Sequence, residues 1–139
     1  MFRRILVPLD FTTKNRRAVR AAARLAASSG AETVLLHVIE RIDMSAGGTL
    51  RNFYRALERN AQKKMLDFLL PFRERGLAVR AEVVYGNRVN EILRFAEENR
   101  SDLIVLSSHK LPLRRGGENW GTISYKVGIL ARCPVLLVK

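Results

Sequence analysis

The stretch "RILVPLDFTTKNRRAVRAAARLAASSG", residues 4–30, joins a strand pattern directly to a helix pattern. Its beginning, "RILVPL" at 4–9, is a short apolar run of strand-forming residues, which is typical of a strand buried on both faces. From Asn15 onward the stretch is rich in alanine and arginine, which favours a helix, and Gly30 is a suitable C-terminal stop. The stretch therefore predicts one strand followed by one helix.

The same alternation continues to the end of the chain. Further apolar runs that predict strands lie at 33–39, 79–85, 102–107 and 134–138. Helical patterns lie between them, over 50–72, after Asn87 and over about 121–131. Strands that are separated by single helices pair in parallel through right-handed crossovers. We therefore predict a doubly wound α/β fold that occupies residues 1–139 as one domain.

The composition excludes some classes of protein and leaves others open. No apolar run is long enough to span a membrane, and Cys133 is the only cysteine, so no internal disulfide forms. A cytoplasmic location is expected. The net charge of +12 would attract nucleic acid or other anions. The basic residues are spread over several segments without an aromatic-rich RNA-binding signature, which favours a solvated basic surface over a nucleic-acid partner.

The motifs of the common nucleotide-binding folds are missing. The chain has no G-x-x-x-x-G-K-[ST] loop, and "PLDFTT" at 8–13 stands where a G-x-G-x-x-G turn would follow the first strand. Ligands of doubly wound sheets nevertheless bind at the carboxyl ends of the strands. Asp10 lies at such an end, where it can bind a ribose hydroxyl or cap the next helix. Gly121-Thr122 opens the last helix, where it can hold a phosphate or act as an ordinary N-cap.

Neither histidine predicts a catalytic or metal site. His37 lies within the second strand and is interpreted as a structural histidine, whereas His109 can equally contact a ligand or lie on the surface. No cysteine or carboxylate cluster accompanies either residue, so no metal site is expected. Cys133 has no evident partner base and is interpreted as a buried small side chain. No catalytic residue is predicted.

Four segments together resemble one known family. They are "RILVPLDFT" (4–12), "LLHVIE" (35–40), "YGNRVNEILRFAEENRSDLIVLSSH" (85–109) and "GTISYKVGILARCPVLLVK" (121–139). In this order and spacing they resemble the universal stress protein family from end to end. The resemblance implies a five-stranded parallel sheet of order 3-2-1-4-5 with helices on both faces, and a homodimer paired through the last strand, Pro134–Val138. Many members bind ATP or another adenine nucleotide, and others bind none.

The resemblance also implies a set of nucleotide-binding positions. They are Pro8, Leu9 and Asp10 after the first strand, Val38 near the adenine, and Leu106, Ser107, Lys110, Gly121, Thr122, Ile123 and Ser124 around the phosphates. The phosphate loop departs from the family pattern. Ser107 and Lys110 stand in the places of two glycines, and the spacing from Lys110 to Gly121 is one residue longer. Glycine allows a close backbone approach and positive φ angles that other residues resist.

Two functions remain open from the sequence. The first is a regulatory protein that binds an adenine nucleotide, in which Lys110, Arg114 and Arg115 compensate electrostatically for the missing glycines. The second is a nucleotide-free dimeric signalling module of the same family, with its pocket filled by side chains such as Trp120 or Leu111. An enzyme is not expected, although weak ATP hydrolysis would be compatible with the family.

Overall fold

The computed structural model describes residues 1–40, 48–108 and 122–139. Strands and helices alternate along this part of the chain, as the sequence predicts. The elements are β1 (Arg4–Pro8), α1 (Asn15–Ser29), β2 (Glu32–Ile39), α2 (Gly48–Arg73), β3 (Val79–Tyr85), α3 (Arg88–Glu98), β4 (Leu103–Ser107), α4 (Ile123–Leu130) and β5 (Val135–Val138).

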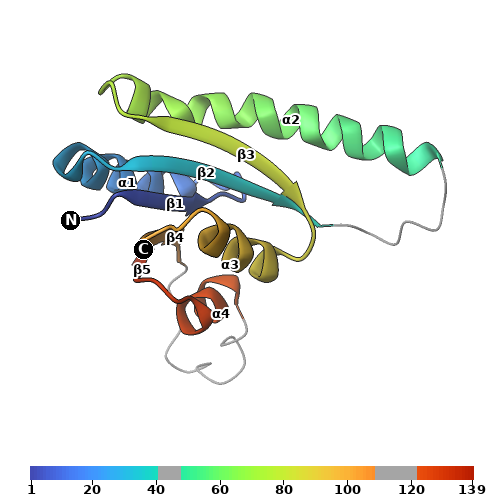
Figure 1. The fold of residues 1–139 in the computed structure, drawn as a ribbon. Helices are drawn as coiled ribbons and strands as arrows, with labels where there is room; N and C mark the ends of the chain where they lie inside the picture. Colours follow the sequence, from blue (N-terminus) through green and yellow to red (C-terminus); the bar gives the residue numbers. More distant parts are fainter. Residues whose placement is uncertain (41–47, 109–121) are drawn as a thin grey trace.

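The five strands form one parallel sheet of order β3-β2-β1-β4-β5, which confirms the expected order 3-2-1-4-5 (Figure 1). Ile5 of β1 pairs with Thr33 of β2 on one side and with Leu103 of β4 on the other. The chain therefore changes direction across the sheet at β1, and the crevice between the ends of β1 and β4 is the topological switch point. β3 lies at an edge of the sheet, in agreement with its more alternating sequence.

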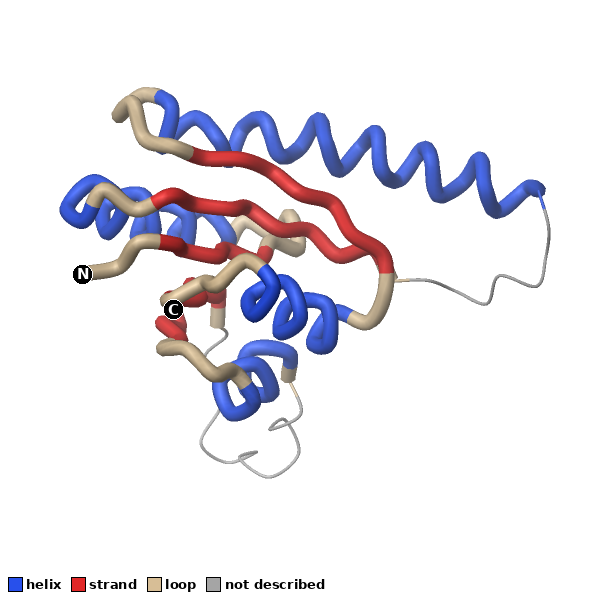
Figure 2. The backbone as a smooth tube through the Cα atoms, in the orientation of Figure 1, coloured by secondary structure: helices blue, strands red, loops and turns tan. Residues whose placement is uncertain are grey.

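The helices cover both faces of the sheet because successive side chains of a strand point to opposite sides (Figure 2). Ile5 and Val7 of β1 pack with residues of α1 and α2 on one face. Leu6 packs with residues of α3 and α4 on the other. Each face has its own buried cluster, and the central strands are apolar on both sides, which accounts for their unbroken runs of apolar residues.

Local signals fix where the helices begin and end. Gly30 follows α1 in the left-handed conformation with φ 71°, and its N–H donates to the carbonyl of Ala26. Asn87 caps α3, as expected, because its Oδ1 accepts a hydrogen bond from the N–H of Asn90. Gly86 has φ 143°, and a Cβ there would lie 2.7 Å from a carboxylate oxygen of Glu91, so the turn from β3 into α3 requires glycine.

In the part of the chain that the structure describes, no helix is both long and apolar enough to cross a membrane.

Candidate functional site

A cavity of about 380 Å³ opens at the carboxyl ends of β1 and β4. We call it the carboxyl-edge pocket. Its walls come from β1, β2, β4 and the first turns of α1, α3 and α4. The lining residues are Pro8, Leu9, Asp10, Asn15, Leu36, Val38, Arg88, Ile92, Leu106, Ser107, Thr122, Ile123 and Ser124. The pocket therefore lies at the switch point of the sheet, where α/β folds bind their ligands, and its volume lies within the range of small-molecule sites.

The floor of the carboxyl-edge pocket is apolar. Val38 of β2, Ile92 of α3 and Leu106 of β4 are all buried, with at most 5% of each residue exposed. They belong to the cluster that packs α3 and α4 against the sheet, so their positions are fixed by the core. A rigid apolar surface of this kind suits a flat aromatic group, because burying the ring against it removes apolar area from water.

The rim of the pocket is polar. The Asp10 carboxylate is exposed, and its Oδ1 accepts hydrogen bonds from the N–H and the hydroxyl of Thr12, at 2.9 and 2.8 Å. Thr122 is the N-cap of α4, and its Oγ1 lies 3.4 Å from the hydroxyl of Ser124. Arg88 brings a positive charge, with Nε 3.9 Å from a carboxylate oxygen of Glu40. The side chains of this pair are about half exposed, so the pair is weak and the guanidinium remains available to an anion.

Asn15 joins the two strand ends that form the pocket. Its side chain is buried, with 2% of the residue exposed. Its Oδ1 accepts hydrogen bonds from the backbone N–H groups of Asp10 and Phe11, at 2.9 and 2.8 Å, and its Nδ2 donates to the hydroxyl of Ser107 at 2.9 Å. Asp10 is not the cap of this helix, because the N-cap residue is Lys14, which makes no side-chain capping bond. Asn15 instead turns back to fix the loop after β1.

The loop after β1 is strained at Phe11. This residue has φ 65°, a left-handed conformation that is rare for a bulky side chain. Its N–H is held by Asn15, and its ring stacks on His37 with the ring centroids 4.1 Å apart. The Nδ1–H of His37 donates to the carbonyl of Leu9 at 2.8 Å. His37 is therefore a structural residue, as expected, and supports the loop that carries Asp10.

Burial lowers the pKa of His37 below its ordinary value of 6.5, and the positive charges of Arg88 and Lys64 act in the same direction. The hydrogen bond to Leu9 and the charge of Asp10 oppose this shift without cancelling it. The folded protein therefore holds a neutral imidazole at a pH where an unfolded chain would already be protonated.

Acid should weaken the fold through His37. As the pH falls below about 6.5, the unfolded chain binds a proton at this site before the folded chain does, so the free energy of unfolding decreases. The decrease ends once the folded form is protonated as well. We expect the urea-unfolding free energy to fall more steeply between about pH 7.5 and 5.5 in the native protein than in a His37→Gln variant. Equal slopes in the two proteins would contradict this role.

The structure brings nine of the sequence-predicted site residues into the carboxyl-edge pocket. They are Pro8, Leu9, Asp10, Val38, Leu106, Ser107, Thr122, Ile123 and Ser124. Lys110 and Gly121 lie outside the described residues, as do His109, Leu111, Arg114, Arg115 and Trp120. The geometry of the phosphate loop therefore stays a prediction.

Sequence reasoning missed four residues of the pocket, which are Asn15, Leu36, Arg88 and Ile92. Leu36 and Ile92 are apolar residues of a strand and a helix, and their sequence pattern indicates only that they are buried. Arg88 had one usable signal, since it directly follows a strand end and the turn Gly86-Asn87. Asn15 is a polar residue on an otherwise alanine-rich inner face, which is unusual enough to suggest a buried hydrogen-bonding role.

Among residues 1–40, 48–108 and 122–139, no group of three or more His, Cys, Asp or Glu side chains could hold a metal ion. Cys133 is partly buried, and burial raises the pKa of its thiol. A raised pKa disfavours the thiolate, which is the nucleophilic form of cysteine.

The chain matches the universal stress protein family over residues 1–139. It is 30% identical to the universal stress protein YxiE of Bacillus subtilis over 149 aligned positions, which cover all of both chains. Its structure is similar to that of a universal stress protein family member from Burkholderia pseudomallei, with a TM-score of 0.79 and 26% identity over 97% of this chain and 94% of the other.

Two further structures with the same fold contain adenine nucleotides. One is a universal stress protein in complex with cAMP, with a TM-score of 0.79 and 20% identity over 99% of this chain and 97% of the other. The second is the universal stress protein from Archaeoglobus fulgidus in complex with dAMP, with a TM-score of 0.72 and 18% identity over 99% of this chain and 98% of the other.

Proposed function

The chain belongs to the universal stress protein family, and from that premise we propose that it is a regulatory protein that binds an adenine nucleotide in the carboxyl-edge pocket. One observation carries the proposal. A single cavity at the switch point of the sheet combines a buried apolar floor with a carboxylate, three hydroxyls and an arginine on its rim. This is the set of groups that an adenosine with a phosphate requires.

The floor and Asp10 would hold the adenosine part. The adenine ring would lie on Val38, Ile92 and Leu106, where it loses contact with water. Asp10 would accept hydrogen bonds from the ribose hydroxyls. Its Oδ1 is used by Thr12, and in the described part of the chain its Oδ2 accepts no hydrogen bond. The carboxylate is therefore oriented by the protein and has one oxygen left for a ligand.

The start of α4 would hold the phosphate nearest to the ribose. Free N–H groups and the helix dipole favour an anion there, and Thr122 and Ser124 add hydroxyl donors. Arg88 adds a positive charge on the rim. Further phosphates would depend on Gly121, and on the positive charges of Lys110, Arg114 and Arg115, which compensate for the two missing glycines in this proposal. The complexes of related folds with cAMP and dAMP support an adenine monophosphate as the core ligand.

Calorimetric titration of the nucleotide-stripped protein with AMP, ADP and ATP tests this function. We expect saturable heat with AMP. If Lys110, Arg114 and Arg115 compensate for the two missing glycines, the affinity should increase from AMP to ATP. Absence of heat and of any thermal shift at millimolar nucleotide would leave the alternative, a nucleotide-free interaction module of the same family.

We further propose that the protein is a homodimer paired through β5. This strand is an edge of the sheet and pairs only with β4 among the described strands. Its Leu136 and Leu137 point to opposite faces, and each is more than a third exposed. An exposed apolar edge strand is a site for pairing with another chain, and a second copy would cover both leucines.

A Leu136→Lys/Leu137→Lys variant should therefore be a monomer where the native protein is a dimer, because two charges would be buried at the shared edge. Sedimentation velocity measures the change. The matched control is Leu66→Lys/Leu70→Lys, which replaces two comparably exposed leucines of α2. A native protein that sediments as a monomer would refute the proposal. Dissociation of the control variant would show that the effect is not specific to β5.

A further inference from the structure

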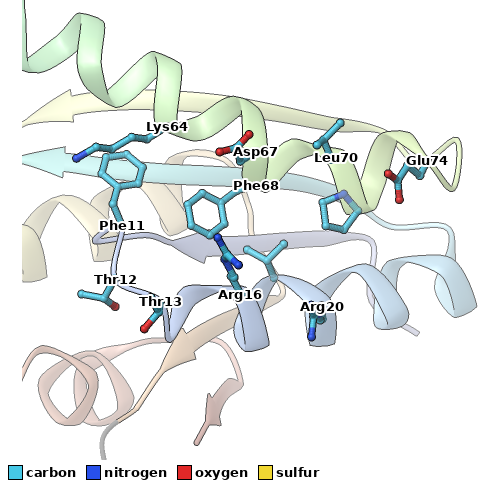
Figure 3. A pocket seen from close by; sticks show the side chains of 12 residues that line it. Phe11, Thr12, Thr13, Arg16, Arg20, Lys64, Asp67, Phe68, Leu70 and Glu74 are labelled. Carbon is cyan, nitrogen blue, oxygen red and sulfur yellow. The ribbon is translucent and has the colours of Figure 1, made fainter.

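A second cavity, of about 480 Å³, lies between α1 and α2 on the opposite face of the sheet (Figure 3). We call it the interhelical groove. Its apolar lining residues are Phe11, Val19, Phe68, Leu70 and Pro71. Nothing in the proposed nucleotide site uses this cavity. Its volume is that of a site for a small organic ligand.

Two aromatic rings form one end of the groove. The rings of Phe11 and Phe68 are nearly parallel, with an interplanar angle of 26° and centroids 6.3 Å apart, and both side chains are only partly buried. Phe11 is held from behind by the stack on His37 and from its backbone by Asn15. The Phe11 ring is therefore preorganised, which lowers the entropy cost of placing a flat ligand ring against it.

Positive charge lies beside these rings. The Nζ of Lys64 lies 5.5 Å from the centroid of the Phe11 ring. Figure 3 shows Arg16 below Phe68 on the α1 side and Lys64 above Phe11 on the α2 side. Among the described residues, neither cation has a carboxylate within 4.0 Å. Among the described residues, a ligand anion in the groove could therefore approach these cations more closely than any carboxylate of the protein does.

The groove also contains carboxylates, and their positions determine the orientation in which a charged ligand binds. Asp67 and Glu74 both come from α2, and Arg20 brings a third cation from α1. Figure 3 places Glu74 at the end of the groove away from Phe11, and Asp67 on the far side of Phe68 from Arg16. Arg16 lies beside Phe68, whereas the end at Phe11 carries the cation of Lys64 and lies away from Glu74. A ligand with a single acid group would place that group there and its apolar part along Phe68 and Pro71.

We propose that the interhelical groove is a second ligand site, which binds a small aromatic monocarboxylate against Phe11 and Phe68, with its carboxylate at the Phe11 end, where the long side chains of Lys64 and Arg16 can turn toward it. Two cations with aromatic rings beside them match a carboxylate that is directly attached to an aromatic ring. The groove and the carboxyl-edge pocket lie on opposite faces of the sheet and approach each other at the loop after β1, where Asp10 lines the pocket and Phe11 lines the groove.

The probe is 2-naphthoate, titrated into the full chain by calorimetry beside its neutral isostere 2-naphthamide. We expect saturable binding of the acid and about tenfold weaker binding of the amide, which corresponds to the loss of one charge-assisted contact. An Arg16→Gln/Lys64→Gln variant should bind the acid about tenfold more weakly and the amide unchanged. No saturable binding at millimolar acid, or equal affinity for acid and amide, would overturn the proposal.

Two control variants locate the binding. Arg24→Gln/Lys63→Gln makes the same change of charge on the exposed surfaces of the same two helices, outside the groove. Arg88→Gln removes the cation of the carboxyl-edge pocket. Both variants should bind 2-naphthoate with an affinity within about twofold of the native protein, since neither substitution touches the groove.

A loss of affinity in the first control equal to that in the groove variant would show non-specific attraction by net charge. A loss with Arg88→Gln would place the ligand in the carboxyl-edge pocket. Either result contradicts the proposal.

Discussion

Replacing Asn15 with leucine should reduce the free energy of unfolding by about 2–5 kcal/mol, because it leaves two partly buried backbone N–H groups without an acceptor and removes the partner of the Ser107 hydroxyl. The side chains are similar in size, so the change removes hydrogen bonds rather than volume. The N–H groups of Asp10 and Phe11 lose Oδ1, and the hydroxyl of Ser107 loses Nδ2. Urea unfolding followed by circular dichroism measures the loss.

The matched control is Asn60→Leu, the same chemical change at an exposed position of α2. Its effect should stay within about 0.5 kcal/mol of zero. The Asn15 variant should also bind AMP more weakly, because the loop that carries Asp10 is no longer tied to β4. A loss of stability below about 1 kcal/mol would mean that the loop finds other partners and that Asn15 does not position the site.

Replacing Asp10 with alanine should weaken the binding of AMP by about 10- to 100-fold. The proposed contact is a charge-assisted hydrogen bond from a ribose hydroxyl to the Asp10 carboxylate, and bonds of this type are about twice as strong as neutral ones. The carboxylate is exposed in the free protein, so its removal should change the stability far less than it changes the affinity. Calorimetric titration of both proteins with AMP gives the ratio of dissociation constants.

The control for Asp10→Ala is Asp67→Ala, which removes an exposed carboxylate from the other face of the sheet. Its affinity for AMP should remain within about twofold of the native value. A second comparison uses 2′,3′-dideoxyadenosine monophosphate, which lacks both ribose hydroxyls. If Asp10 holds these hydroxyls, the native protein discriminates against this analogue and the Asp10→Ala variant does not. Discrimination that survives in the variant would assign the ribose contact to another residue.

Most of the fold could be predicted from local patterns. The apolar runs of β1 and β4 are continuous because both strands are covered on two faces, and Gly30 and Asn87 mark a helix end and a helix start by their own backbone chemistry. These signals depend only on neighbouring residues, so they can be recognised in a single sequence. The order of the strands is not local. It followed from the family resemblance, and the structure confirms it.

The site was predictable only where a residue stands at a strand end. Asp10 and Ser107 could be placed at one edge of the sheet because parallel strands end together. Asn15 and Arg88 belong to helix starts, and their place in the pocket depends on how each helix packs on the sheet. The left-handed φ of Phe11 has no sequence signal of its own, because it arises from the hydrogen bond to Asn15 and the stack on His37.

The most direct test of nucleotide binding in the carboxyl-edge pocket is a titration of the stripped protein with AMP, followed by the backbone amide resonances in NMR. The account predicts saturable shifts concentrated at Asp10, Val38, Ser107, Thr122 and Ser124, with smaller changes at Phe68 on the other face of the sheet. Shifts centred on the interhelical groove, or no shifts at millimolar AMP, would contradict it.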